Sequence, residues 1–371
     1  MVIDTAPKGA PKRKQVSRNF RTLQEAREFV TETRQNVAQG RYTAPSKVTF
    51  RTLAEDWLKS RRDIREVTRS GYADALGNPL DFFGDHIAQS LSRTDVENLM
   101  DHLGTFGGKR GKPLSQRSQV YALQAVRAVF AYGVSVGVLS ANPATDVKPR
   151  RRTKDDALAV NIWAPAQLVQ FVAHVDTHEE EWTRAAFRLS ACGLRRSEVL
   201  GLAWSEVDLD SGTVKVEASR VKVGRGSTTN RDATKSKASS RAVPVEEMWP
   251  GTVAALRALK ARQAADRLAM GTAWPDSGLV VVDESGSPIQ PDAYSGRWRV
   301  LRADAGLPRI RLHELRHSIA TTLHRSGVAP ADAAGLLGHE VATHMSFYVQ
   351  STKTGAEEAA RTLGSVLRTV Q

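Results

Sequence analysis

Histidine is concentrated in one stretch of the chain. Five of the nine histidines lie between positions 313 and 344: His313, His317, His324, His339 and His344. The densest part reads Arg311-Leu-His-Glu-Leu-Arg-His-Ser318. Imidazoles exchange protons near neutral pH and are common ligands of transition metals. This stretch therefore predicts either acid–base chemistry or a metal site.

The pattern His313-Glu314-x-x-His317 matches the H-E-x-x-H motif of zinc metalloproteases, in which two histidines on one helix face bind the metal. Arg316, however, stands three residues after His313 and next to His317. A guanidinium stays charged in proteins and repels a dication on the same face. We therefore expect no metal and no other cofactor. A zinc hydrolase stays as an alternative hypothesis that requires bound metal.

A second motif, Cys192-Gly-Leu-Arg-Arg-Ser-Glu198, breaks one helix at Gly193 and begins another. Arg195 then lies at a helix N-terminus, where the partial positive charge of the backbone already favours an anion. Glu198 follows three residues later and is expected to orient Arg195 rather than to touch a substrate.

A third motif, Leu336-Leu-Gly-His339, places a histidine at a turn broken by glycine, and Tyr348 follows nine residues later. Arginine grips two oxygens of a phosphate in a planar fork, whereas histidine carries protons near neutrality. A tyrosine hydroxyl becomes a nucleophile where cationic neighbours or a base help it lose its proton. The arginines and histidines of these motifs suit the binding of an anion.

The overall charge points to the same substrate. Lys and Arg number 53 and Asp and Glu 40, so 53 − 40 gives a net charge of +13 in a chain of 371 residues. Such an excess is typical of proteins that bind polyanions, most often nucleic acid. The chain has no long apolar run, its first residues show no apolar h-region, and Cys192 is its single cysteine. These features predict no membrane partner, no disulfide framework, no Cys-based zinc finger and a cytoplasmic location.

The first half of the chain shows helical periodicity after a basic start. The first dozen residues predict a flexible basic arm, followed by one short strand near 15–20 and a helix from about 22 to 39. Further amphipathic segments fit helices, the first with a predicted capping box at Thr52-x-x-Glu55: 50–58, 68–83, 92–103 and 115–132. Nothing between 46 and 147 alternates like a strand, so this region predicts an all-α bundle.

The second half of the chain contains both helical and strand patterns. After a basic linker, helices fit 165–175 and 182–191, and an alternating strand follows the turn at 208–212. Residues 220–241 predict a long basic hairpin that returns through Arg241-Ala-Val-Pro-Val245. Helices then continue to the C-terminus. The fold class is therefore multidomain and mainly α, with small β elements in an α+β second half.

In chain order, these motifs resemble those of the tyrosine recombinase (phage integrase) family. They are Gly-Leu-Arg-x-Ser-Glu at 193–198, His-x-Leu-Arg-His at 313–317, Leu-Gly-His at 337–339 and Tyr348 nine residues later. The N-terminal phrases Phe20-Arg-Thr and Gly40-Arg-Tyr42 are similar to the arm-binding domain of lambda-type integrases. Such domains usually place a three-stranded sheet before the helix, and residues 1–20 leave room for little more than one strand.

The resemblance implies four segments. They are an arm-type DNA-binding domain at 1–45, a core-type DNA-binding helical domain at 46–147, a basic linker at 148–162 and a catalytic domain at 163–371 that ends in an exchange helix. Basic residues of the arm and the linker are expected to contact DNA: Lys12, Arg13, Lys14, Arg18, Lys148, Arg150, Arg151 and Arg152.

The resemblance also implies the roles of the site residues. Arg195 and Arg316 clamp the scissile phosphate, His313 is the acid–base, His339 hydrogen-bonds the phosphate, and Tyr348 is the nucleophile. The family uses a hairpin lysine as general acid, here Lys235, with Lys237 as the runner-up. His317, one position past Arg316, is expected to pack or to support the site residues without touching the substrate. No metal and no ATP is implied, because a 3′-phosphotyrosyl linkage retains the energy of the broken bond.

The expected function is that of an integrase from a temperate phage, for which the Ala-, Arg- and Val-rich composition suggests an actinobacterial, mycobacteriophage-like source. It would recombine phage and bacterial attachment sites as a tetramer on double-stranded DNA. Expected helpers are a host DNA-bending integration factor and, for excision, a phage excisionase. Two further alternatives are a DNA-binding regulator without chemistry and a relaxase-like or type IB topoisomerase activity.

Overall fold

The structure, a computed structural model, describes residues 2–4, 15–17, 19–38, 42–150, 161–223, 227–233, 240–342, 345, 360–361 and 368. The chain divides into two compact units, unit 1 at residues 1–158 and unit 2 at residues 159–371. The predicted arm and bundle segments both fall in unit 1, and the predicted catalytic domain falls in unit 2. The predicted exchange helix near the C-terminus lies almost entirely outside the described residues.

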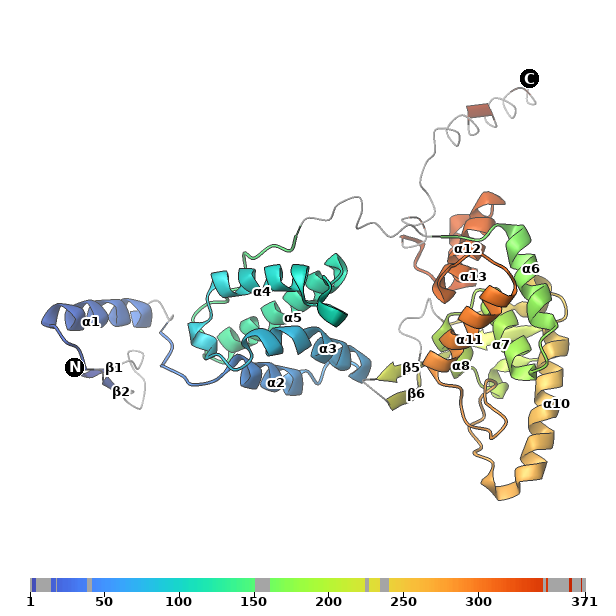
Figure 1. The fold of residues 1–371 in the computed structure, drawn as a ribbon, viewed down its shortest axis with the longest axis horizontal. Coiled ribbons are helices and arrows are strands. Elements are labelled where there is room, and N and C mark those ends of the chain that lie inside the picture. The colour runs from blue at the N-terminus through green and yellow to red at the C-terminus, as the bar shows by residue number, and fades with distance from the viewer. Residues whose placement is uncertain are drawn as a thin grey trace. The chain divides into compact units, whose positions relative to one another are not determined.

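Unit 1 is helical apart from a small N-terminal sheet (Figure 1). Its elements are β1 (Val2–Asp4), β2 (Gln15–Ser17), α1 (Leu23–Ala38), α2 (Phe50–Ser60), α3 (Glu66–Phe83), α4 (Arg93–Thr105) and α5 (Gln116–Ser135), with 3₁₀ turns at Ala88–Ser90 and Lys109–Gly111. Helices α2 to α5 occupy the range for which the sequence predicts an all-α bundle. The buried side chains of these helices form one core around Phe50, whose ring meets Phe83 edge-on at 4.8 Å.

Two details of unit 1 differ from the sequence prediction. Residues 2–4 and 15–17 form two antiparallel strands, in which Ile3 pairs with Val16, whereas one strand was predicted. Helix α2 begins at Phe50 and is capped by Thr49, whose hydroxyl accepts the amide of Thr52 at 3.2 Å. The predicted capping box at Thr52 was therefore wrong by one turn. Thr49 precedes a buried aromatic residue, so packing of Phe50 fixes where the helix starts.

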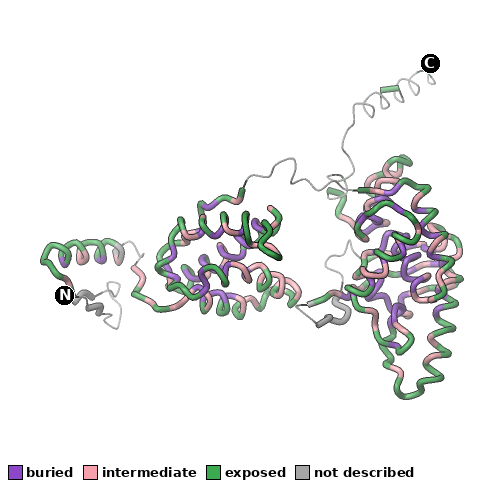
Figure 2. Tube along the Cα trace, viewed as in Figure 1, coloured by how far each residue is buried: buried purple, intermediate pink, exposed green. Residues whose placement is uncertain are grey.

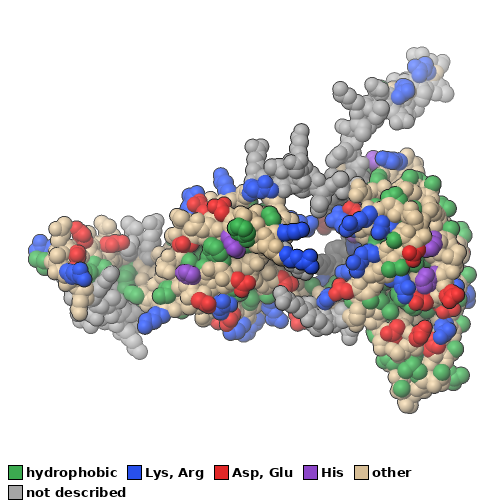
Figure 3. Space-filling model, in the orientation of Figure 1, with side chains coloured by type: hydrophobic (Ala, Val, Ile, Leu, Met, Phe, Trp, Pro, Cys, Tyr) green, Lys and Arg blue, Asp and Glu red, His purple; other side chains and the backbone are tan. Residues whose placement is uncertain are grey.

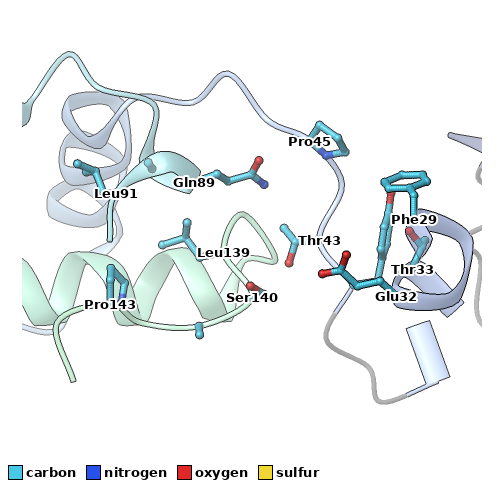
Figure 4. Close-up of a pocket in the computed structure, with 13 residues that line it drawn as sticks. Phe29, Glu32, Thr33, Thr43, Pro45, Gln89, Leu91, Leu139, Ser140 and Pro143 are labelled. Carbon is cyan, nitrogen blue, oxygen red and sulfur yellow. The ribbon is translucent and has the colours of Figure 1, made fainter. Parts of the chain in front are cut away.

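A pocket of about 560 Å³ lies within unit 1, lined by α1, the connection after it and the chain beyond α5 (Figure 4). Its side chains are mostly uncharged, with Glu32 the one charged residue among the described residues that line it. Gln89 holds the connection in place, because its amide accepts from Ser46 and donates to the carbonyls of Ala44 and Val138. Because these lining residues include no cation, the pocket has no positively charged side chain that would bind a phosphate.

Unit 2 is an α+β domain. Its helices are α6 (Pro165–Asp176), α7 (Glu181–Ala191), α8 (Arg196–Gly201), α9 (Val245–Met248), α10 (Thr252–Met270), α11 (Pro291–Asp304), α12 (Leu312–Arg325) and α13 (Pro330–Leu337), with 3₁₀ turns at Trp204–Glu206 and Gly271–Ala273. Its strands are β3 (Val207–Asp208), β4 (Thr213–Val216), β5 (Ala218–Val223), β6 (Ser227–Ala233) and β7 (Arg241–Pro244). The chain is thus mainly α with small β elements, as the sequence predicts.

The strands of unit 2 form two antiparallel sheets rather than one hairpin. Strand β4 lies between β3 and β7, while β5 pairs with β6 alone. The predicted return strand at 241–245 exists as β7, but it pairs with β4, so that Val216 lies opposite Arg241. The predicted hairpin is therefore confirmed only in part: β5 and β6 form a hairpin over 218–233, whereas the predicted return strand pairs with β4. The cause is tertiary, because Val214, Val216 and Val243 are buried together in the core of unit 2.

The core of unit 2 combines many aliphatic side chains with a cluster of aromatic rings, and the buried segments run through the middle of the unit (Figure 2). Trp163 and Trp298 have ring centroids 5.3 Å apart, and Phe187 stacks on Tyr294 at 4.5 Å. The Tyr294 hydroxyl is buried and donates to the carbonyl of Ala186 at 2.9 Å. Among the described helices, none combines the length and apolar character needed to cross a bilayer.

Candidate active site

The N-terminus of α8 positions the first arginine. Glu198 accepts the backbone amide of Arg195 at 2.8 Å and thereby caps the helix. The same carboxylate accepts Nη1 of Arg195 at 2.5 Å, and the carbonyl of Gly338 accepts Nη2 at 2.6 Å. The Arg195 side chain is 29% exposed, whereas Glu198 is 4% exposed. Glu198 and the carbonyl of Gly338 thus hold the Arg195 side chain in place, while part of it stays accessible to solvent.

The N-terminus of α12 has the same local pattern. Glu314 accepts the backbone amide of Arg311 at 2.5 Å and its Nη2 at 2.7 Å. The Glu314 carboxylate is therefore engaged by Arg311. Burial alone would raise the pKa of Glu314, but the hydrogen bonds and charge of Arg311 outweigh it and lower this pKa. One turn of α12 then brings His313 and His317 together, with ring centroids 4.8 Å apart.

The C-terminal turn of α13 binds three arginines. The carbonyls of Leu336, Leu337 and Gly338 accept guanidinium N–H groups from Arg241, Arg316 and Arg195, in that order. The last carbonyls of a helix lack partners within the helix and carry partial negative charge. One helix end therefore collects three positive charges.

Arg316 is buried and contacts His339. Its Nε donates to Nε2 of His339 at 3.1 Å, and its Nη1 donates to the carbonyl of Gly193. Because Nε2 accepts this bond, His339 is neutral in this arrangement, with its proton on Nδ1. Gly338 has a φ of 62° and ends the helix, which turns His339 toward Arg316.

A pocket of about 380 Å³ is lined by Arg195, His313 and Arg316, together with Arg196 and Ser295. The structure therefore brings together two predicted arginines and one predicted histidine, with His339 hydrogen-bonded to one of them. Figure 3 shows Lys and Arg side chains gathered over the α12 side of unit 2. A concave site with several guanidinium groups suits a phosphate anion.

The cationic surroundings determine the protonation of the site. Burial, the neighbouring His317 and then the nearby arginines lower the pKa of His313 from 6.5 to about 4. The pKa of His317 is lowered as well, by burial and by Arg316. At neutral pH His313 is therefore a neutral imidazole that can accept a proton.

Glu198 is the carboxylate that balances these cations. Burial alone would raise its pKa, but Arg241, followed by Arg195 and Arg316, lowers the pKa of Glu198 to about 2. Both of its oxygens are bonded to Arg241, at 3.3 and 3.0 Å. Glu198 is therefore ionised at neutral pH.

Several predicted residues lie outside the described part of the chain: Lys12, Arg13, Lys14, Arg18, Arg151, Arg152, Lys235, Lys237 and Tyr348. Their predicted roles stay predictions. Lys148 and Arg150 are described and are exposed at the end of unit 1.

Arg241 and Arg196 are functional candidates that the sequence motifs did not predict. Arg196 lines the pocket and donates to the hydroxyl of Ser295 at 2.7 Å. Its position beside Arg195 was the available signal. Arg241 gave no such signal, because a basic residue at the end of a basic hairpin predicts exposure, and its burial follows from packing against α13.

The described residues around His313 do not favour the zinc hypothesis. Among the described residues, no group of three or more His, Cys, Asp or Glu side chains could hold a metal ion. The zinc hypothesis also needs Glu314 beside the two histidines as a base, whereas this carboxylate caps α12 and binds Arg311. The side chains around His313 thus fit an anion better than a dication.

Comparison with known proteins gives a consistent result. Residues 163–354 match the phage integrase family. The tyrosine recombinase XerC of Pseudomonas syringae pv. syringae is 27% identical over 303 residues, which cover 78% of this chain and 89% of that protein. A tyrosine recombinase XerC-like protein of Caldanaerobacter subterraneus is 25% identical over 64% of this chain and 64% of its own length.

Solved structures share the fold. The Tn1549 transposon integrase in complex with transposon right end DNA superposes with a TM-score of 0.68 at 20% identity and covers 85% of this chain and 100% of that chain. The lambda integrase tetramer bound to a Holliday junction gives a TM-score of 0.58 at 14% identity, covering 92% of this chain and 91% of that one.

Proposed function

Because the chain belongs to the phage integrase family, whose members break and rejoin DNA strands as tyrosine recombinases, we propose that it recombines phage and bacterial attachment sites. The observation that carries this proposal is the pocket in which Arg195, His313 and Arg316 meet. The net charge of +13 supports a DNA substrate.

The two arginines bind the scissile phosphate. A phosphodiester carries one negative charge, and its transition state concentrates charge on the non-bridging oxygens. Arg195 reaches the pocket from α8, and Arg316 reaches it from α12. Their bonds to Glu198 and to backbone carbonyls hold both guanidinium groups in place before DNA arrives. Positioned charge of this kind stabilises the transition state without reorganisation.

Proton transfer and nucleophilic attack complete the reaction. Tyr348 attacks phosphorus, its proton passes to the neutral imidazole of His313, and a 3′-phosphotyrosyl bond forms as the bond to the 5′-oxygen breaks. A hairpin lysine, Lys235 or Lys237, protonates the leaving oxygen to give a 5′-hydroxyl. His339 hydrogen-bonds the phosphate. Attack by a 5′-hydroxyl of the partner strand reverses these steps and releases Tyr348, so neither ATP nor water is consumed.

Replacement of the nucleophile tests the chemistry. The Tyr348→Phe variant deletes one hydroxyl and keeps the ring, so DNA affinity should change little. On a nicked suicide substrate, which loses its short fragment after cleavage, the wild type should accumulate a denaturation-resistant protein–DNA adduct and the variant none. Tyr294 cannot substitute, because its hydroxyl is buried and bonded to Ala186. Equal adduct from both proteins would refute the assignment.

The finer proposal is phage integration, with residues 1–45 as an arm-binding domain, a source in an actinobacterial temperate phage, and a tetramer on DNA in the cytoplasm. The sheet β1–β2 followed by α1 supports an arm domain. The XerC relatives favour a second candidate, a Xer-type chromosomal recombinase. A host DNA-bending factor and an excisionase are the expected partners of the first candidate, the phage integrase.

Deletion of residues 1–45 separates the two candidates. If these residues bind arm sites, the truncated protein should lose integrative recombination between attachment sites and keep salt-dependent binding to core sites. The matched control is the full chain with the same core DNA. Recombination at the full rate after the deletion would favour the Xer-type candidate.

A further inference from the structure

Arg241 is a buried arginine outside the roles proposed above. It begins β7, its side chain is 7% exposed, and it is absent from the described residues that line the pocket. Its Nε donates to the carbonyl of Leu336 at 2.8 Å, and Nη1 and Nη2 donate to Glu198 at 3.3 and 3.0 Å. All three nitrogens are thus bonded to protein, as they are in Arg316, but Arg316 lines the pocket and Arg241 does not.

The carboxylate of Glu198 joins two arginines. Its Oε1 accepts Nη1 of Arg195 at 2.5 Å, and its Oε2 accepts the backbone amide of Arg195 at 2.8 Å. Arg241 binds the same two oxygens. A carboxylate held by bidentate contact keeps its plane fixed. The orientation of Glu198, and with it that of Arg195, therefore depends on Arg241.

Arg241 also contacts the turn that binds Arg195 from the other side. The carbonyl of Leu336 binds Arg241, and that of Gly338, two residues later, binds Arg195. A Cβ atom at position 338 would stand 2.7 Å from Nη1 of Arg241, so the turn packs directly on this guanidinium. Both supports of the Arg195 side chain, Glu198 and the turn, thus rest on Arg241.

We propose that Arg241 is a positioning residue that holds Arg195, through Glu198 and the turn at Leu336–Gly338, in the place where it neutralises the scissile phosphate. This inference rests on the proposed function, because it takes Arg195 as the phosphate clamp. Arg241 itself touches no substrate. Its loss should affect the rate of cleavage more than the affinity for DNA, since DNA affinity comes from many phosphate contacts.

The test compares Arg241→Gln with wild type on two suicide substrates. One carries the natural phosphate at the cleavage site, and the other a methylphosphonate, which lacks the negative charge. On the phosphate, adduct should form at least about tenfold more slowly in the variant, with little change in DNA affinity. On the methylphosphonate, the variant should approach the wild-type rate, because less charge needs neutralising. Arg195→Gln should show the same convergence.

Two controls separate positioning from folding. Arg220→Gln removes another buried arginine of unit 2, one that binds the carbonyl of Ile289 at 2.7 Å, whereas the hydrogen bonds of Glu198 within the described residues go to Arg195 and Arg241. If Arg220→Gln slows adduct formation, it should do so by the same factor on both substrates. Arg241→Lys keeps the charge but cannot span three acceptors, so its rate should lie between those of Arg241→Gln and wild type. If Arg241→Gln does not fold, Arg241→Lys takes its place on both substrates.

The proposal is overturned if the Arg241 variant is slowed by the same factor on both substrates, which would indicate a general structural defect. A wild-type rate on the phosphate would overturn it as well. Failure of the proposed function is distinguishable, because the wild type would then form no adduct on either DNA.

Discussion

The helices α8 and α12 both begin with Arg-x-x-Glu, and their first turns are nearly the same. In each, the glutamate accepts the backbone amide of the arginine and its side chain, as Arg195 with Glu198 and Arg311 with Glu314. Both glutamates are buried, at 4% and 5% exposed. The arginines differ, since Arg195 is 29% exposed and lines the pocket, whereas Arg311 is 63% exposed.

The difference comes from what packs against each turn. Glu198 also binds Arg241, and Arg195 also binds Gly338, so the α8 pair is part of a network across three segments. The α12 pair is local. A surface ion pair contributes little to stability, whereas removal of one member of a buried network leaves an uncompensated charge. We therefore expect the same Arg-x-x-Glu pattern to contribute very differently to stability at the two helices.

The largest expected effect is that of Glu198→Ala. The substitution leaves Arg241 and Arg195 without their shared carboxylate, and we expect the free energy of unfolding to fall by about 3–5 kcal/mol. Urea unfolding of the full chain at pH 7 measures it, and adduct formation should fall as well. A loss below about 1 kcal/mol would mean that the α8 network is no stronger than a surface pair.

A smaller, pH-dependent effect is expected at His313. Its pKa is about 4 in the folded protein and 6.5 when unperturbed, so the unfolded chain binds more protons between these values. The free energy of unfolding should therefore fall as the pH decreases from about 6.5 to about 4. The matched His313→Asn variant should lose less stability between pH 7 and pH 4.5. Equal losses in the two proteins would show that the site does not depress this pKa.

The smallest effects are expected at α12. Glu314→Ala removes a helix cap and one local pair, which should cost about 1 kcal/mol. Arg311→Ala removes only the exposed partner and should cost less than about 1 kcal/mol. Both proteins should keep adduct formation near the wild-type rate. Thermal unfolding of these two variants and of Glu198→Ala under the same conditions compares the two helices. A loss of stability in Glu314→Ala as large as that in Glu198→Ala would contradict the predicted difference between α8 and α12.

Local signals predicted the helices well. The serines Ser92 and Ser115 stand at the starts of α4 and α5 as caps, where the sequence places helix starts. Gly193 and Gly338 lie at turns with positive φ, as their place in the two motifs indicates. Capping and glycine preferences act over a few neighbouring residues, so a single sequence is enough to show them. The predicted start of α2 at residue 50 is confirmed, but its cap was misassigned, because Thr49 and not Thr52 precedes the buried Phe50 and caps the helix.

The sequence by itself determined the mainly helical fold class, the basic character and the motifs that contain Arg195, His313, Arg316 and His339. Only the tertiary structure decided that the end of α13 binds three arginines, that β7 pairs with β4, and that Arg241 is buried against Glu198. The reason is physical. Helix caps and periodicity depend on near neighbours in the chain, whereas burial of a charge depends on partners more than 40 positions away, which no local pattern specifies.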